Sequence, residues 1–133
     1  MMMETDGCHS CYDIDGEVIP RHVTRVRIHE SVTVIPARAF YNNRSIEELE
    51  CHDRVKTVEE WAFCNCPSLR RVIMPDVEIV EGFAFSGCEA LACVECGKLE
   101  IIKGSAFSSC RSLSSINLPS AKVVKEHALL TQP

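Results

Sequence analysis

The chain lacks any segment of the kind that enters or crosses a membrane. None of its 133 residues belongs to a run that approaches the roughly 18 consecutive apolar residues of a spanning helix. The first residues, MMMETDGCHSCYDIDGE, have neither the basic region nor the apolar region of a secretory signal peptide. We therefore expect a soluble protein with no membrane partner, for which the cytoplasm is the default location.

An excess of basic residues is also missing. The sequence has 14 Lys and Arg against 19 Asp and Glu, for a formal net charge of -5. Binding to nucleic acid needs a clustered basic surface that neutralises phosphates, so the composition argues against such a partner. Hydrophobic residues make up 46% of the chain, which is enough for a substantial core in about one domain.

Residue combinations typical of enzymes are absent as well. The sequence has no nucleophile, base and acid set, no glycine loop that would cradle a phosphate, and no pair of carboxylates suited to a shared pocket. We predict no catalytic activity, no cofactor and no metal site built from the core of the fold.

What the sequence does contain is a repeat. The pair Ala-Phe recurs at steps of 23, 22, 22 and 22 residues, with Leu in the last copy, at Ala39-Phe40, Ala62-Phe63, Ala84-Phe85, Ala106-Phe107 and Ala128-Leu129. Further apolar positions keep the same register, such as Leu69, Val72 and Met74 in the third copy. Chance does not plausibly align seven apolar columns over four or five copies, so the chain is a repeat array.

Each repeat is predicted to form one coil of a solenoid. In SLRRVIMP, Val72 and Met74 point inward and Ile73 outward, and Pro75 ends the strand because proline cannot extend a hydrogen-bonded ladder. The apolar spacing in the next piece, DVEIVEGFAFSGC, fits an extended bend that leads into a single helical turn. We expect parallel pairing of strands between coils and the repeat Phe side chains in a single file inside.

Units such as VEIVEGFAFSGCEALACVEC and LEIIKGSAFSSCRSLSSINLP resemble the BspA-like, or Treponema pallidum type, leucine-rich repeat, in which Ala-Phe, a following Cys and a strand-ending Pro recur together. The resemblance covers about residues 23 to 130. It implies an α/β leucine-rich repeat solenoid, right-handed, with short parallel β-strands on one face, short helical turns and about five repeats of 22-23 residues. Residues 1-22 are then an N-terminal flank and cap, and residues 23-133 the solenoid. The family implies a protein-protein interaction scaffold and supplies no catalytic residue.

Nine cysteines need an explanation in so short a chain. Cys66, Cys88 and Cys110 each follow the repeat Phe by three residues, where Asn43 stands in the first copy. Coils about 4.8 Å apart hold their Cβ atoms beyond the usual disulfide separation of about 3.8 Å, so we expect reduced thiols that bond backbone groups at the bend. Inward strand positions hold Cys51 and Cys96, which leaves Cys8, Cys11, Cys64 and Cys93 outside the core columns.

Two CxxC pairs, at 8-11 and 93-96, have a spacing that suits zinc or redox chemistry. They are 82 residues apart, and Cys96 is expected to point inward while Cys93 points outward, so a shared site is not expected. The alternative to a scaffold is therefore a zinc-binding or thiol-redox role through Cys8, His9 and Cys11 alone.

Outward positions on the predicted strands carry charges whose sign alternates between coils. The candidate binding residues there are Arg25, Arg27, Glu48, Glu50, Arg71, Ile73 and Glu95. Opposite charges become cross-strand neighbours in a parallel ladder, and each exposed pair contributes only a few tenths of a kcal/mol. This face is either self-complementing surface charge or a polar recognition face for a partner protein, and both can hold together.

A second candidate surface is the position just before each repeat Ala, which holds Arg38, Trp61, Phe83, Ser105 and His127. Trp61 and Phe83 occupy adjacent coils. Their rings are expected side by side on the convex edge, where exposed aromatic pairs are typical of contact hot spots and half-buried ones of packing. Solenoids also need terminal caps. We expect Ile14, Val18 and Ile19 to cover the first coil, and an incomplete last repeat that indicates a protein partner, end-to-end self-association, or a fragment of a longer array.

Overall fold

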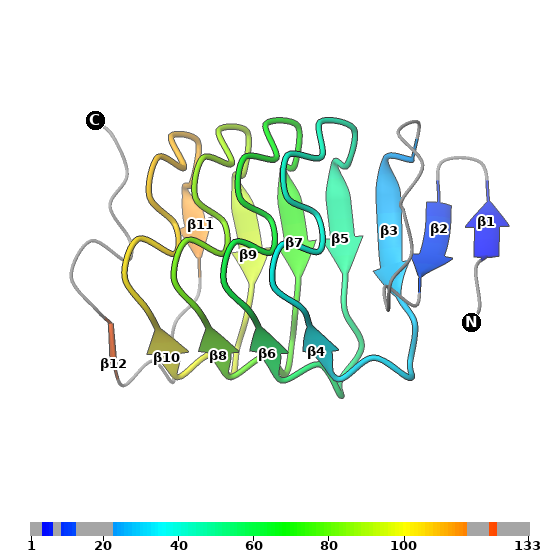
Figure 1. The fold of residues 1–133 in the computed structure, drawn as a ribbon, viewed down its shortest axis with the longest axis horizontal. Coiled ribbons are helices and arrows are strands. Elements are labelled where there is room, and N and C mark those ends of the chain that lie inside the picture. Colours follow the sequence, from blue (N-terminus) through cyan, green and yellow to red (C-terminus); the bar gives the residue numbers. More distant parts are fainter. Residues whose placement is uncertain (1–3, 7–8, 13–22, 117–122, 125–133) are drawn as a thin grey trace.

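The computed structural model describes residues 4–6, 9–12, 23–116 and 123–124, and these form a stack of coils with a sheet on each of two walls (Figure 1). The first sheet has seven strands in the order β1 (Glu4–Asp6), β2 (His9–Tyr12), β3 (Arg25–Ile28), β5 (Glu48–Glu50), β7 (Arg71–Ile73), β9 (Cys93–Glu95) and β11 (Ser115–Ile116). The second has five, in the order β12 (Val123–Val124), β10 (Ile101–Ile102), β8 (Ile79–Val80), β6 (Thr57–Val58) and β4 (Val34–Ile35). The fold is a parallel-strand β-solenoid.

The repeat register of the sequence is the register of the sheets. Val26 pairs with Leu49, Leu49 with Val72, and Val72 with Val94, so each strand lies beside its equivalent in the next coil. Every pair in both sheets is parallel except β1 with β2, which is antiparallel. Strand β7 ends at Ile73, before the buried Met74 and the exposed Pro75, as the sequence predicts.

A single file of phenylalanine rings runs through the interior, which confirms the central sequence prediction. The ring centroids of Phe40 and Phe63 lie 4.7 Å apart, those of Phe63 and Phe85 5.0 Å, and those of Phe85 and Phe107 5.2 Å. Successive ring planes differ by 7° or less. All four rings are fully buried, so they supply much of the apolar contact between coils.

The predicted helical turn is not found among the described residues, where the segment is a series of β-turns instead. In the first repeat the turns are closed by backbone N–H groups that donate three residues back, from Ala39 to Pro36, from Tyr41 to Arg38 and from Asn43 to Phe40. The alternate N–H groups donate to the next coil, from Arg38 to Glu60, from Phe40 to Ala62 and from Asn42 to Cys64. The turns thereby form a third hydrogen-bonded wall that links the coils.

Left-handed backbone conformations explain why this wall is not helical. Two positions in each repeat have φ between 59° and 77°, and these are Arg38, Asn42, Trp61, Asn65, Phe83, Gly87, Ser105 and Ser109. A right-handed helix requires negative φ, so two positive φ values four residues apart within the turn segment prevent one. Asn and Gly suit this conformation, whereas bulky residues such as Trp61 and Phe83 adopt it rarely and under strain.

The cysteine column stabilises the bend that follows each turn wall. Cys66 donates its thiol to the carbonyl of Phe40 at 3.1 Å, Cys88 to that of Phe63 at 3.1 Å, and Cys110 to that of Phe85 at 3.2 Å. In the first repeat Asn43 Oδ1 instead accepts from the N–H groups of Ser45 and Ile46. These three cysteines are free thiols, as predicted, and so are the other four cysteines between residues 23 and 116.

Burial sets the chemistry of these thiols. Removal from water raises the pKa of Cys110 to about 12, and burial with the nearby Glu50 charge raises that of Cys51 to about 12. The structure corrects one expectation: Cys64, predicted to lie outside the core columns, is buried. Cys51 and Cys96 are buried as predicted, and Cys93 is half-buried.

Strands β1 and β2 extend the first sheet beyond β3, with His9 beside Arg25 and Cys11 beside Arg27 in register. The predicted cap at Ile14, Val18 and Ile19 and the predicted incomplete repeat at Ala128-Leu129 lie outside the described residues. The described part of the chain includes no helix long and apolar enough to span a bilayer.

Candidate functional site

The outward face of the first sheet gathers all seven charged and apolar strand residues that the sequence singled out. Side chains alternate between the two faces of a strand. The residues directly before and after the buried Val26, Leu49 and Val72 in the chain therefore point away from the core. The register aligns one row of Arg25, Glu48, Arg71 and Cys93 and a second row of Arg27, Glu50, Ile73 and Glu95. We call these two rows the sheet face.

Opposite charges on the sheet face lie within reach of one another, and Arg70, which directly precedes β7, reaches the same face. The nitrogen-to-oxygen distances are 3.8 Å for Arg25 and Glu48, 4.0 Å for Arg27 and Glu50, 2.9 Å for Arg70 and Glu48, and 3.0 Å for Arg71 and Glu95. Arg71 therefore reaches Glu95 diagonally, since its partner in register is Cys93. The predicted self-complementing arrangement of charge is present, and such exposed pairs are individually weak.

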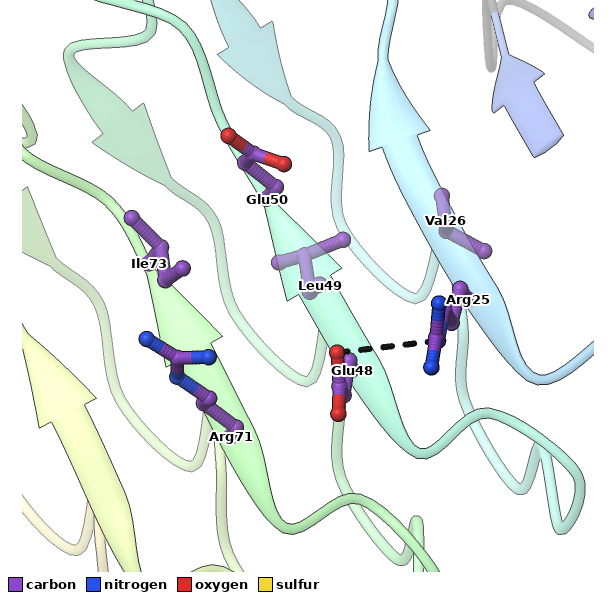
Figure 2. Close-up of a pocket in the computed structure, with 7 residues that line it drawn as sticks. All are labelled: Arg25, Val26, Glu48, Leu49, Glu50, Arg71 and Ile73. Carbon is purple, nitrogen blue, oxygen red and sulfur yellow. Dashed lines mark ion pairs between the residues drawn. The ribbon is translucent and has the colours of Figure 1, made fainter. Parts of the chain in front are cut away.

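The sheet face also contains a shallow depression of about 100 Å³. Figure 2 shows Glu48 between Arg25 and Arg71, with the apolar Ile73 close to the charged groups. The lining residues are Arg25, Val26, Glu48, Leu49, Glu50, Arg71 and Ile73. Small-molecule sites typically enclose about 300–1,000 Å³, so this hollow suits the contact of one protruding side chain better than an enclosed substrate.

A second group of side chains lies on the turn wall, where Trp61 stacks on Phe83 with ring centroids 4.7 Å apart and an interplanar angle of 11°. Tyr41 meets Trp61 edge-on at 6.2 Å. The Arg38 guanidinium carbon lies 5.6 Å from the Trp61 ring centroid and 5.7 Å from that of Tyr41. We call Arg38, Tyr41, Trp61 and Phe83 the outer cluster.

The aromatic members of the outer cluster differ in solvent exposure. Phe83 is 40% and Tyr41 41% exposed, whereas Trp61 is half-buried between its neighbours. The sequence identified the repeat position that Arg38, Trp61 and Phe83 share, but it missed Tyr41. Tyr41 follows its Phe directly and has Cys64 as its equivalent in the next repeat, so no repeating aromatic position marked it.

The structure does not bring the two candidate surfaces together. The strands of the first sheet form one wall of the coils, and the turns that carry the outer cluster form another (Figure 1). Each surface therefore has to be tested separately.

No metal centre is found in the part of the chain that the structure describes. None of its groups of three or more His, Cys, Asp or Glu side chains is arranged to hold an ion. Of the N-terminal CxxC pair, Cys8 lies outside the described residues, whereas His9 and Cys11 belong to β2. In the second pair Cys96 is buried while Cys93 is only half-buried, which agrees with the predicted opposite directions.

The family model and the solved structures that this chain resembles are all of leucine-rich repeat proteins. The model of the BspA type leucine rich repeat region matches residues 21–131 in six copies, where the Ala-Phe spacing suggested about five. The solved structure of a leucine-rich repeat protein from Bacteroides ovatus has 29% identity and a TM-score of 0.66, and covers 74% of this chain and 26% of its own. The leucine-rich repeat protein of T. pallidum has 22% identity and a TM-score of 0.78 over 97% of this chain and 63% of its own.

A leucine-rich repeat protein from Eubacterium ventriosum aligns with a TM-score of 0.58 and 22% identity, and covers 85% of this chain and 42% of its own. The chain thus spans between 26% and 63% of the length of these three proteins. The comparison with curated proteins gave no match.

Proposed function

Because the chain belongs to the BspA-type leucine-rich repeat family, we propose that it is a right-handed, non-catalytic repeat scaffold that binds a partner protein. The observation that carries the proposal is the sheet face, on which the outward side chains of β3, β5, β7 and β9 form two continuous rows. A regular polar wall with only a shallow hollow suits recognition of a second surface.

The weakness of the ion pairs favours this use of the sheet face. Arg71 and Glu95 are each about half exposed, and exposed pairs are worth roughly 0–1 kcal/mol, so a partner can exchange them for its own charges at little expense. Ile73, which lies between charged groups, offers an apolar contact at the centre of the same face. Electrostatic complementarity of this kind would select the partner and orient it.

The zinc or thiol alternative through Cys8, His9 and Cys11 has no support from the comparisons or from the described residues. We therefore do not propose it.

Affinity capture from a native lysate with charge-reversed variants tests the scaffold function. The variant Arg25→Glu, Arg71→Glu changes the sheet face, and the control Lys56→Glu, Lys98→Glu makes the same change of charge at two lysines that pair with Asp76 away from that face. We expect the wild type and the control to retain the same partner and the sheet-face variant to lose it. Retention of every partner by the sheet-face variant would contradict the proposal.

A further inference from the structure

The outer cluster is a stack that stops in the middle of the molecule. Arg38, Trp61, Phe83 and Ser105 occupy equivalent positions in four successive coils, with φ between 60° and 64°. Their side chains therefore leave the turn wall in the same direction. The first three are large and planar, but Ser105 is not, so within the described residues Trp61 alone provides Phe83 with a ring contact.

The same cluster already accommodates an arginine. The Arg38 guanidinium lies over the Trp61 ring at 5.6 Å, at the end of the stack opposite to Phe83. Guanidinium groups stack on aromatic faces because the ring quadrupole attracts the charge and because both groups are flat. A second guanidinium placed over Phe83, above Ser105, would repeat at one end of the stack what Arg38 does at the other.

Three glutamates come just before members of the stack in the chain. A depression of about 260 Å³, lined by Ala37, Glu59, Glu60 and Glu81, is formed by residues that come just before members of the outer cluster in the chain. Glu59 accepts the N–H of Ala37 at 3.1 Å, and Glu81 pairs with Lys103 at 3.0 Å. Glu60 is exposed and forms no ion pair with any cation of the described residues. The open face of Phe83 is turned toward the coil of Ser105, which also contains Lys103, whereas Glu60 belongs to the coil of Trp61. The carboxylate of the Phe83 coil is that of Glu81, and a cation placed over Phe83 would replace Lys103 in a partly exposed ion pair of low stability.

We propose that the outer cluster binds an arginine side chain from a basic segment of the partner protein, with the guanidinium stacked on Phe83 and its charge facing Glu81 in place of Lys103. This inference rests on the proposed scaffold function and names the chemistry of a contact on a wall other than the sheet face. Arginine is favoured over lysine because a lysine ammonium presents a point charge with no plane to stack.

Trp61 makes the test direct, because it is the one tryptophan of the chain and its emission reports on the stack. The probe is the peptide acetyl-Gly-Arg-Gly-Arg-Gly-amide, titrated at low salt against the same peptide with lysine and with glutamate in place of arginine. We expect Trp61 emission to change in a saturable manner with the arginine peptide. The lysine peptide should bind more weakly by about threefold or more, and the glutamate peptide should cause no change in emission.

Four variants locate the contact. Phe83→Asn removes the ring and suits the positive φ, and Glu81→Gln removes the carboxylate that would face the guanidinium, so each should weaken binding of the arginine peptide by about threefold or more. Glu89→Gln makes the same change of charge at an exposed residue outside both candidate surfaces and should leave binding unchanged. Circular dichroism and the thermal midpoint establish that each variant is folded, and Phe83→Leu, which keeps apolar bulk without a ring, should match Phe83→Asn.

The inference is overturned if wild-type Trp61 emission shows no saturable response, if lysine and arginine peptides bind equally, or if the Phe83 variants bind as the wild type does. These results leave the scaffold function untouched when capture of a partner still depends on Arg25 and Arg71. Failure of the proposed scaffold function would instead appear as capture of every partner by the sheet-face variant.

Discussion

Two rows of aromatic rings run along the stack of coils, one inside and one outside, and both begin from the same spacing. Phe40 and Phe63 lie 4.7 Å apart in the interior, and Trp61 and Phe83 lie 4.7 Å apart on the turn wall. The inner row has a ring in four successive coils and is fully buried, whereas Phe83 is 40% exposed. The register of the sheets thus produces stacking wherever flat side chains repeat, and burial decides whether the stack holds coils together or remains open to a partner.

The largest expected effect is a difference between the two rows in how much the loss of one ring lowers the free energy of unfolding. Phe85→Ala should lower the free energy of unfolding by about 3–5 kcal/mol, because it opens a cavity between Phe63 and Phe107 that the coils cannot close. Phe83→Asn, two residues earlier, should change it by less than about 1 kcal/mol, since the ring is exposed and Asn suits the backbone. Urea unfolding of the two variants measures both, and equal losses would remove the distinction between the rows.

Loss of stability from Phe85→Ala should also remain local. Each coil contacts only its neighbours in a solenoid, so the first and second sheets should be weakened most at β7 to β10. Amide hydrogen exchange of the variant should increase there and change least at β3, and a uniform increase along the chain would speak against stacking of separate coils.

An effect of intermediate size, on the pH dependence of stability, tests whether the cysteine column is buried as the inner row of rings is. Burial raises the pKa of Cys110 from the ordinary 9.0 to about 12, so between these values the unfolded state binds fewer protons than the folded state. The stability that the protonated thiol contributes is therefore fully present below about pH 9 and is lost as the pH rises towards about 12. The difference in unfolding free energy between the wild type and Cys110→Ala should shrink from about pH 8 to about pH 10.5, and a constant difference would mean that the thiol is not buried when folded.

The smallest effect concerns the backbone of the turn wall. Gly87, with φ of 77°, and Ser109, with φ of 59°, occupy equivalent positions in adjacent coils. Gly87→Ala should destabilise the protein by about 1 kcal/mol, because alanine adopts this conformation with strain, whereas Ser109→Gly should be neutral or slightly stabilising. Thermal unfolding of the pair measures the difference, and equal midpoints would argue against the left-handed turns.

The inner row could be predicted from the sequence because its signal is redundant. Phe40, Phe63, Phe85 and Phe107 keep one spacing together with the apolar strand positions, and the Cys column follows each Phe at a fixed distance. Since parallel strands pair without slipping when one face is buried, these regular steps determine which residues meet across coils. The alternating charges of the sheet face follow from the same register, and Arg25 and Glu48 are one pair of opposite charges that it brings together.

The turn wall was predicted less well, for a conformational reason. Apolar spacings of three, four and one around Ala84 fit a helical turn and a chain of β-turns equally well. The usual signal of a left-handed residue is Gly or Asn, but Arg38, Trp61, Phe83 and Ser105 adopt this conformation without either. Their backbone is held by hydrogen bonds to the next coil, such as that from Trp61 N–H to the Gly82 carbonyl, which depend on contacts between repeats and leave no local trace.

The most direct test of the account is a proton nuclear Overhauser spectrum that resolves the aromatic side chains. If the repeats stack as described, the Phe63 ring shows contacts to both Phe40 and Phe85, and the indole of Trp61 shows contacts to Phe83 in the same sample. The absence of contacts between Phe63 and Phe85 would contradict the stacked coils themselves, and with them every surface that the register assembles.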